Sequence, residues 1–303
     1  MTDGPAAVAR DVGGSSDVAF LPEEPHESRR LRPVGSSAET QATRPATIAD
    51  APIRSSASAL LPPLAERFDA QLEHKVVVDA EMDPISREQY RRLAAGLHAA
   101  QAASGLKVIL IASALASEGK TLTTSNLALT FSESYQRTVL LIDGDLRRPS
   151  VHQVFGLPRD PGLCEGLLAP ADRKLPLHQV SPRLTVLTAG DVSTGDPMGA
   201  LTSDRMHRVI QEARDAFDWV IVDTPPIGLI SDASLLAEFA DGVILVVKAN
   251  ATPHELVQRA VAALGKDRIL GLVLNRATNP PGGHYKYSYS SYYHSTASGP
   301  RQT

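Results

Sequence analysis

The sequence has little cysteine, no long apolar run and no excess of positive charge. Its single cysteine, Cys164, cannot form a disulfide within the chain, which fits a reducing cytoplasm and a packing role for this side chain. No stretch approaches the roughly 18 apolar residues of a membrane helix, and the N-terminus lacks a basic region followed by an apolar one. A formal net charge of −4 disfavours nucleic acid as the main partner. We therefore expect a cytoplasmic protein that reaches the membrane only through a partner.

The pattern along the chain predicts three regions. Residues 1–70 are rich in Pro, Ser, Ala, Arg and Glu without apolar periodicity, which predicts a disordered N-terminal segment. Residues 71–279 form the predicted folded domain, and 280–303 a flexible tyrosine-rich tail. In the domain, apolar strands alternate with helices, which predicts an α/β fold with a mostly parallel central sheet flanked by helices. Strands are predicted at 107–112, 138–143, 184–188, 219–223, 242–248 and 271–275, and helices at about 121–136, 203–217, 232–240 and 253–265.

Two helix starts carry capping signals. A helix is expected to begin near Ser86, where Ser86 and Gln89 have the spacing of a capping box. The last predicted helix has Thr252 as its expected cap, Pro253 in the first turn and Glu255 completing the box.

A phosphate-binding loop is predicted between the first of these strands and its helix. The run ASALASEGKT at 112–121 follows an apolar segment and precedes a helical stretch. Its spacing matches G-x-x-x-x-G-K-[ST], except that Ala114 replaces the first glycine. In such a loop, backbone N–H groups and a helix N-terminus surround phosphate oxygens, while the Lys contacts the outer phosphates. Lys120 and Thr121 therefore indicate a nucleotide-triphosphate site.

Carboxylates at the ends of two further strands strengthen this interpretation. Asp143 and Asp145 end the strand in VLLIDGD, and Asp223 ends the strand in WVIVD. The carboxyl ends of parallel strands meet where ligands bind, and Mg²⁺ prefers hard oxygen ligands such as carboxylates and a Thr hydroxyl. Each Asp alone could be a helix cap or a turn former. Together with the loop, the three predict a site for a nucleotide and Mg²⁺.

Tyrosines gather near the C-terminus. Five of the seven fall between 285 and 293, after a ProProGlyGly break at 280–283. One interpretation is a strand with alternate tyrosines on one face, or a low-complexity tail. The other is a kinase substrate, because a flexible tail can bring a hydroxyl into an active site. The tyrosines concerned are Tyr285, Tyr287, Tyr289, Tyr292 and Tyr293.

Four features of the sequence together resemble bacterial tyrosine autokinases of capsule and exopolysaccharide biosynthesis. They are the loop, the Asp-x-Asp-x-Arg segment at 143–147, the Val-Asp-Thr-Pro-Pro segment at 222–226 and the tyrosine cluster. The resemblance covers roughly residues 80–293. It implies a P-loop NTPase-like fold with deviant Walker motifs and an ATP- and Mg²⁺-dependent kinase. This enzyme would phosphorylate its own tail between subunits of a ring and regulate polysaccharide polymerisation and export. The implied partners are a membrane-spanning co-polymerase that recruits it to the inner face of the membrane, and sugar-nucleotide enzymes as further substrates.

The resemblance also implies roles for individual residues. Lys120 would hold the β- and γ-phosphates, Thr121 would ligate Mg²⁺, and Asp223 would act at or beside the metal. Asp143 and Asp145 would divide metal binding and activation of the tyrosine hydroxyl, with either as the base. Arg147 would add a cation or be a salt-bridged surface residue, and Asn275 would contact adenine or be a turn former. The implied nucleotide-binding set is Ala114, Ser117, Glu118, Gly119, Lys120, Thr121, Leu122 and Asn275.

The sequence departs from the family pattern at two places. Ala116 and Ser117 stand where Pro-Gly is common, which removes a glycine from the loop. In the oligomerisation motif Glu-x-x-Arg-x-x-Arg, Glu88 and Arg91 match, while Ala94 replaces the second Arg; the first two could equally be a surface pair.

Two other functions fit the same motifs. One is a partitioning or septum-positioning ATPase switch, although such proteins usually carry a second Lys where this chain has Leu115. The other is a nucleotide-binding regulator without catalysis.

Overall fold

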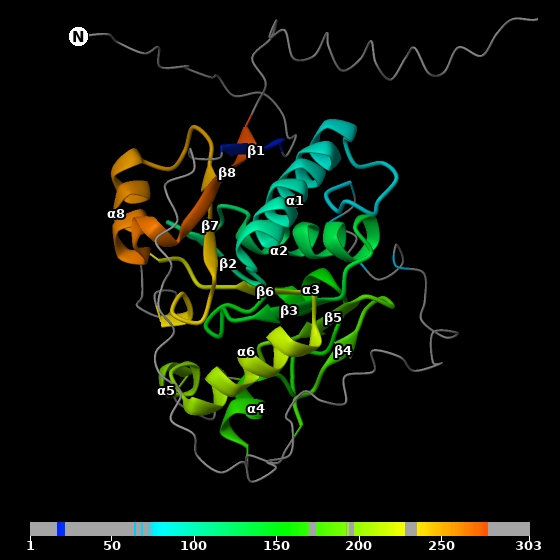
Figure 1. Cartoon of the computed structure of the whole chain (residues 1–303), viewed down its shortest axis with the longest axis vertical. Helices are drawn as coiled ribbons and strands as arrows, with labels where there is room; N and C mark the ends of the chain where they lie inside the picture. Colours follow the sequence, from blue (N-terminus) through cyan, green and yellow to red (C-terminus); the bar gives the residue numbers. More distant parts are fainter. Residues whose placement is uncertain are drawn as a thin grey trace, which may run out of the picture.

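A single sheet of eight strands forms the centre of the molecule (Figure 1). The computed structural model describes residues 17–21, 64, 68, 72, 74–169, 174–191, 193, 197–227 and 235–277. The strands are β1 (Asp17–Leu21), β2 (Val108–Ser113), β3 (Val139–Asp143), β4 (His178–Gln179), β5 (Leu184–Leu187), β6 (Trp219–Asp223), β7 (Gly242–Lys248) and β8 (Ile269–Ala277). Their order is β1-β8-β7-β2-β6-β3-β5-β4. The six inner strands are parallel, and β1 and β4 pair antiparallel at the two edges. The predicted mostly parallel α/β fold is confirmed.

Helices cover both faces of the sheet, with α1 and α2 on one side and α5 and α6 on the other (Figure 1). On β2, Ile109 packs with the first group and Leu110 with the second, so the strand is buried on both faces and has a continuous apolar sequence. The helices are α1 (Pro84–Ser104), α2 (Lys120–Leu129), α3 (Val151–Val154), α4 (Leu163–Leu168), α5 (Pro197–Leu201), α6 (Asp204–Ala216) and α8 (His254–Leu264), with a π-helix η4 (Thr130–Ser134) and a 3₁₀-helix η5 (Lys266–Arg268).

All six predicted strands are present, with ends shifted by at most two residues. The helix predicted to begin near Ser86 is present as α1, but its predicted capping box is wrong. The capping residue is Asp83, whose carboxylate accepts hydrogen bonds from the backbone N–H of Ser86 at 2.9 Å and from its hydroxyl at 3.0 Å. Pro84 then occupies the first turn, where its missing N–H costs no hydrogen bond. Ser86 therefore lies inside the helix and is not its cap.

The predicted cap of α8 is also wrong. Pro253 is the N-cap residue and makes no side-chain capping bond. The hydroxyl of Thr252 donates instead to the carboxylate of Glu118, far away in the sequence. A long-range contact has therefore replaced the local one that the sequence pattern indicates.

Two other predicted helices have different extents. The helix predicted at 121–136 is α2 followed by η4, which ends at Ser134. The helix predicted at 232–240 lies partly outside the described residues, and its described part holds a helical turn at 235–236 followed by turns.

Strand β1 lies within the segment 1–70 for which disorder is predicted, and at these five residues that prediction does not hold. The run DVAFL contains Val and Phe, residue types that are frequent in strands, and it extends the sheet beside β8. Most of the remaining N-terminal segment and all of the tail lie outside the described residues.

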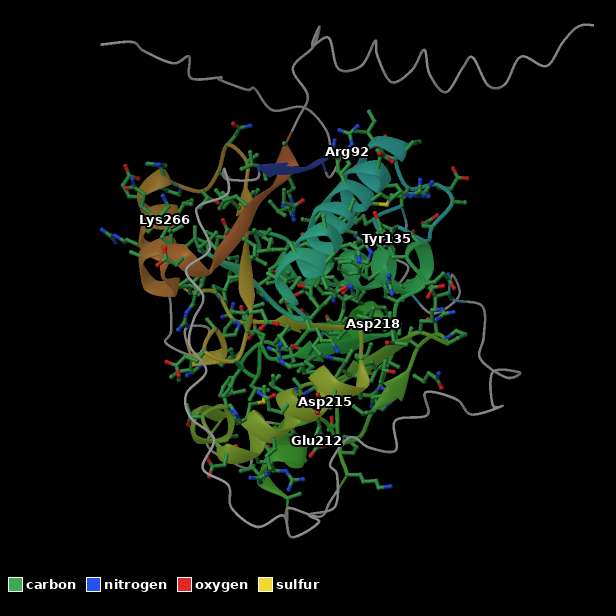
Figure 2. The ribbon with its side chains drawn as sticks, viewed as in Figure 1. Arg92, Tyr135, Glu212, Asp215, Asp218 and Lys266 are labelled. Carbon is green, nitrogen blue, oxygen red and sulfur yellow. The ribbon has the colours of Figure 1, made fainter. Side chains whose placement is uncertain are left out.

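Side chains at the amino ends of the strands hold β2 and β3 in place. Asp218 accepts hydrogen bonds from the backbone N–H of Thr138 at 2.8 Å and from its hydroxyl at 2.9 Å (Figure 2). Asp241 accepts from the backbone N–H of Lys107 at 2.7 Å and that of Val108 at 2.8 Å. These contacts help to fix the alignment of the strands at their amino ends, and therefore also the positions of their carboxyl ends.

Candidate nucleotide site

The loop between β2 and α2 follows the predicted phosphate-binding sequence. Ser117 and Gly119 have positive φ angles of 64° and 89°, and Ala116 and Ser117 are exposed at its tip. A side chain at Gly119 would place a Cβ 1.9 Å from Nδ2 of Asn275, so only glycine fits there. Helix α2 begins at Lys120, directly after the loop. Its N-terminal N–H groups and the loop backbone therefore lie where an anion is favoured.

The structure brings Lys120, Thr121, Asp145 and Asp223 together. Nζ of Lys120 lies 2.7 Å from Oδ1 of Asp223 and 3.9 Å from Oδ2 of Asp145. The hydroxyl of Thr121 donates to Oδ2 of Asp223 at 2.7 Å. The Lys120 side chain is 7% exposed and that of Asp223 is fully buried, so this ion pair is well shielded from water. A single ammonium thus faces two carboxylates beside a hydroxyl.

Asp143 adjoins this group because β3 and β6 pair with Asp143 opposite Asp223. Its carboxylate is completely buried and accepts hydrogen bonds from the backbone N–H groups of Asp145 at 3.2 Å, Ser150 at 3.1 Å and Val151 at 3.0 Å. Burial, followed by the neighbouring charge of Asp223, raises the pKa of Asp143 to about 7. Asp143 therefore orders the segment after β3 with both of its oxygens.

Asp145 has a different environment. One oxygen accepts from the backbone N–H of Arg148 at 3.0 Å, and the other faces Lys120. Burial raises the pKa of Asp145, and Lys120 opposes this effect. The sequence left the roles of Asp143 and Asp145 open, and these contacts distinguish them: Asp143 is engaged by backbone donors, whereas Asp145 faces the ammonium of the loop.

The raised pKa of Asp143 predicts a measurable pH effect. In the unfolded chain this carboxyl ionises near pH 3.8, whereas in the folded protein it ionises only near 7. Its contribution to stability is therefore lost as pH rises from about 4 to about 7, and is constant above that range. Asp143→Asn removes this loss. We expect the stability of the variant relative to the original protein to be higher at pH 8 than at pH 5, measured by urea unfolding with EDTA and without nucleotide.

The comparison of the two proteins at each pH cancels the titration of the groups that do not interact with Asp143. The loss of a backbone hydrogen bond at the new amide adds only a constant offset. A difference in unfolding free energy that is the same at pH 5 and pH 8 would show that Asp143 ionises normally in the folded protein.

The other predicted residues have varied surroundings. Ala114 is buried at the start of the loop, Leu122 is half-buried on α2, and the side chain of Arg147 is exposed. Asn275 donates from Nδ2 to the backbone carbonyl of Glu118 at 2.8 Å, and its Oδ1 accepts from the backbone N–H of Arg276 at 2.9 Å. The amide of Asn275 is thus bonded to the loop and to its own strand. Its predicted contact with adenine remains a prediction.

The sequence did not indicate a role at the site for Ser150 or Thr252, nor the side-chain contacts of Glu118. The Ser150 hydroxyl lies 3.0 Å from that of Thr121, and Glu118 is bonded to Thr252. No local pattern carries these contacts, because each joins residues at least 29 positions apart.

Two further predictions concern residues outside the loop. Glu88 and Arg91 form a surface pair in one interpretation of the sequence. The carboxylate of Glu88 instead lies 3.5 Å from Nε of Arg92, one helical turn along α1 (Figure 2). The tyrosine cluster at 285–293 lies outside the described residues. Within the part of the chain that the structure describes, no helix has the length and apolar character needed to cross a membrane.

The parallel sheet, the glycine-lysine loop and the helix that follows it define a P-loop NTPase. The family model ParA, described as NUBPL iron-transfer P-loop NTPase, matches residues 106–291, which is more than half of the chain. The chain therefore belongs to this family of P-loop NTPases.

Relatives identify the branch. Tyrosine-protein kinase YwqD of Bacillus subtilis is 34% identical over 215 residues, which cover 70% of this chain and 90% of YwqD. The succinoglycan biosynthesis transport protein ExoP of Rhizobium meliloti is 33% identical over 233 residues, 72% of this chain and 29% of ExoP. The solved kinase domain of the Escherichia coli tyrosine kinase ETK superposes with a TM-score of 0.62 at 29% identity, covering 73% of this chain and 91% of that domain. The chain belongs to the bacterial tyrosine kinases, as the sequence motifs predict.

Proposed function

We propose that this protein is an ATP-dependent autokinase that phosphorylates tyrosines of its own C-terminal cluster, in one subunit by another. The observation that carries the proposal is the position of Lys120, which ends the phosphate loop and lies 2.7 Å from Asp223 and 3.9 Å from Asp145. Phosphoryl transfer depends on positioning and charge neutralisation, which a lysine among strand-end carboxylates can supply. Membership of the tyrosine kinases supports tyrosine as the acceptor.

ATP would bind with its phosphates along the loop from Ala114 to Gly119. The exposed residues Ala116 and Ser117, the latter with a positive φ, and the N-terminus of α2 would offer N–H groups to its phosphate oxygens. Lys120 would leave the carboxylates to contact the β- and γ-phosphates, since a triphosphate carries more negative charge than Asp145 and Asp223 together.

The residues also fit Mg²⁺. The Thr121 hydroxyl and Asp223 Oδ2 lie 2.7 Å apart, and Asp145 faces the same lysine. Among the described residues no group of three His, Cys, Asp or Glu side chains could hold a metal by itself. Mg²⁺ needs only one or two carboxylates from the protein, because it takes its other ligands from phosphate and water. When bound, Mg²⁺ shields the charge of the phosphates. Thr121, Asp145 and Asp223 would hold it.

In the proposed reaction, the phenol oxygen of a tail tyrosine forms a bond to the γ-phosphorus while the bond from that phosphorus to ADP breaks. The phenolic proton passes to a carboxylate. With Asp145 holding the metal, Asp143 is the carboxylate that would receive it, because burial raises the pKa of Asp143 to about 7. Arg147, whose side chain is exposed, would add a cation beside the incoming tail.

We further propose that the kinase acts in the production of an exopolysaccharide or capsule, with a membrane-spanning co-polymerase as partner. The similarity to ExoP, a succinoglycan biosynthesis transport protein, supports this setting. This chain aligns with 29% of ExoP, so the remainder of that protein has no counterpart in the alignment. Recruitment to the inner face of the membrane, a ring of subunits and sugar-nucleotide enzymes as further substrates belong to the same proposal.

The test is mass spectrometry of the purified protein after incubation with Mg-ATP, with and without the cytoplasmic segment of a candidate co-polymerase. We expect phosphate on one or more of the tyrosines at 285–293, and more of it when the activating segment is present. ATP hydrolysis without any modified tyrosine under either condition would instead indicate an ATPase switch of the partitioning type.

A further inference from the structure

The side chain of Glu118 lies inside the protein although it belongs to an exposed loop. The residue is 2% exposed, whereas its neighbour Ser117 is exposed. One oxygen accepts from the backbone N–H of Leu115 at 2.7 Å, within the same loop. The other accepts from the backbone N–H of Lys248 at 3.3 Å and from the hydroxyl of Thr252. Glu118 thus joins the two ends of the loop and ties them to the connection between β7 and α8.

A second contact holds the same residue from β8. Nδ2 of Asn275 donates to the backbone carbonyl of Glu118 at 2.8 Å. The carbonyl of Asn275 in turn accepts from the backbone N–H of Ala249 at 2.9 Å, in the connection that also holds Thr252. The backbone and the side chain of Glu118 are therefore both fixed by the carboxyl ends of the neighbouring strands.

The loop needs such support because of its own sequence. Ser117 has a φ of 64°, a left-handed conformation that is unfavourable for a residue other than glycine. Ala114 stands where the motif has its first glycine. A loop with fewer glycines reaches this conformation at a greater cost, and the buried hydrogen bonds of Glu118 can offset that cost.

We propose that Glu118 is a positioning residue that, together with Thr252, holds the phosphate loop in the conformation that binds nucleotide. The inference rests on the proposed function only in taking the loop as the ATP site. In this arrangement Glu118 does not touch the nucleotide. Its backbone carbonyl and carboxylate face the protein and use the N–H of Leu115, so the phosphates would bind to the other N–H groups of the loop.

The measurement is the affinity of the full chain for ADP, by calorimetry with magnesium, alongside the KM for ATP and kcat. Glu118→Gln cannot accept all of the same hydrogen bonds, because its amide nitrogen is a donor. We expect ADP binding to weaken about tenfold and the KM for ATP to rise by a similar factor, with kcat changed by less than about threefold. In the nucleotide-free protein, hydrogen exchange at the amide of Leu115 should become faster.

Two more variants make the test specific. Thr252→Val removes the hydroxyl donor from the other side, and its effect should not add to that of Glu118→Gln if the two residues act through one contact. Ser117→Gly relieves the positive φ, and should restore most of the affinity lost in Glu118→Gln. Glu255→Gln, which changes an exposed acid in the first turn of α8, is the matched control and should bind ADP as the original protein does.

ADP affinity in Thr252→Val within twofold of the original, or additive effects in the double variant, would overturn the inference. The inference would also be contradicted if Glu118→Gln weakened ADP binding by the same factor alone and in combination with Ser117→Gly. The role of Glu118 would then not concern the conformation of the loop. A failure of the proposed function is distinct: in that case the original protein itself hydrolyses ATP without modifying a tyrosine, or binds no nucleotide at all.

Discussion

Lys120→Met is expected to reduce phosphorylation of the tail by on the order of a thousandfold, the loss typical of removing one group that stabilises charge in a transition state. Lys120 is the single cation that the structure places within 4.0 Å of both Asp145 and Asp223 among the described residues. Without it, no side chain of this group can neutralise the charge that moves between the phosphates. The measurement is the rate of phosphotyrosine formation at saturating Mg-ATP, followed by mass spectrometry.

The burial of Lys120 complicates this variant. Removing one partner of a buried ion pair commonly costs about 3–5 kcal/mol, so Lys120→Met alone is expected to be less stable. The double variant Lys120→Met with Asp223→Asn removes both charges of the closest pair and should recover much of the stability while remaining inactive. Lys266→Met, an exposed lysine after α8, is the control and should retain full activity (Figure 2). Phosphorylation of the tail by a folded Lys120→Met protein would exclude the proposed mechanism.

Much of the architecture could be predicted because parallel strands buried on both faces have continuous apolar sequences. VLLID at 139–143 and WVIVD at 219–223 are such strands, and each ends in an Asp that the parallel sheet brings to one edge. The proximity of Asp143, Asp223 and Lys120 therefore follows from the alternation of strands and helices together with the loop motif.

The features that the sequence did not reveal depend on contacts between distant residues. Thr252 has the sequence context of a cap, but its hydroxyl is used by Glu118, which is 134 positions earlier. The cap of α1 is an exception, because Asp83 followed by Pro84 is a local signal of a helix start, and the capping-box spacing at Ser86 competed with it. The contrast between Asp143 and Asp145 depends on backbone N–H groups at 150 and 151 that return to β3. Periodicity and spacing contain no information about such contacts.

A second prediction with a large expected effect concerns whether the kinase modifies the tyrosines of its own subunit or those of another subunit. Strand β8 runs parallel to β7 and β2, so it ends at the same edge of the sheet as the phosphate loop. The eight residues from 278 to 285 can span at most about 29 Å when extended, so length alone allows the tail to reach its own site. Transfer between subunits is therefore a proposal that a mixing experiment has to separate from transfer within one subunit.

Mixing two inactive chains distinguishes the alternatives. One chain carries Lys120→Met and an intact tail; the other has an intact loop and Phe at all five positions of the cluster. Neither can modify its own cluster, because the first lacks the lysine and the second lacks the acceptors. We expect the mixture to place phosphate on the tail of the Lys120→Met chain, at a rate that rises with the concentration of the Phe-substituted chain. A mixture with no phosphate on that tail, under conditions in which the original protein modifies itself, would mean that each tail turns back to its own active site.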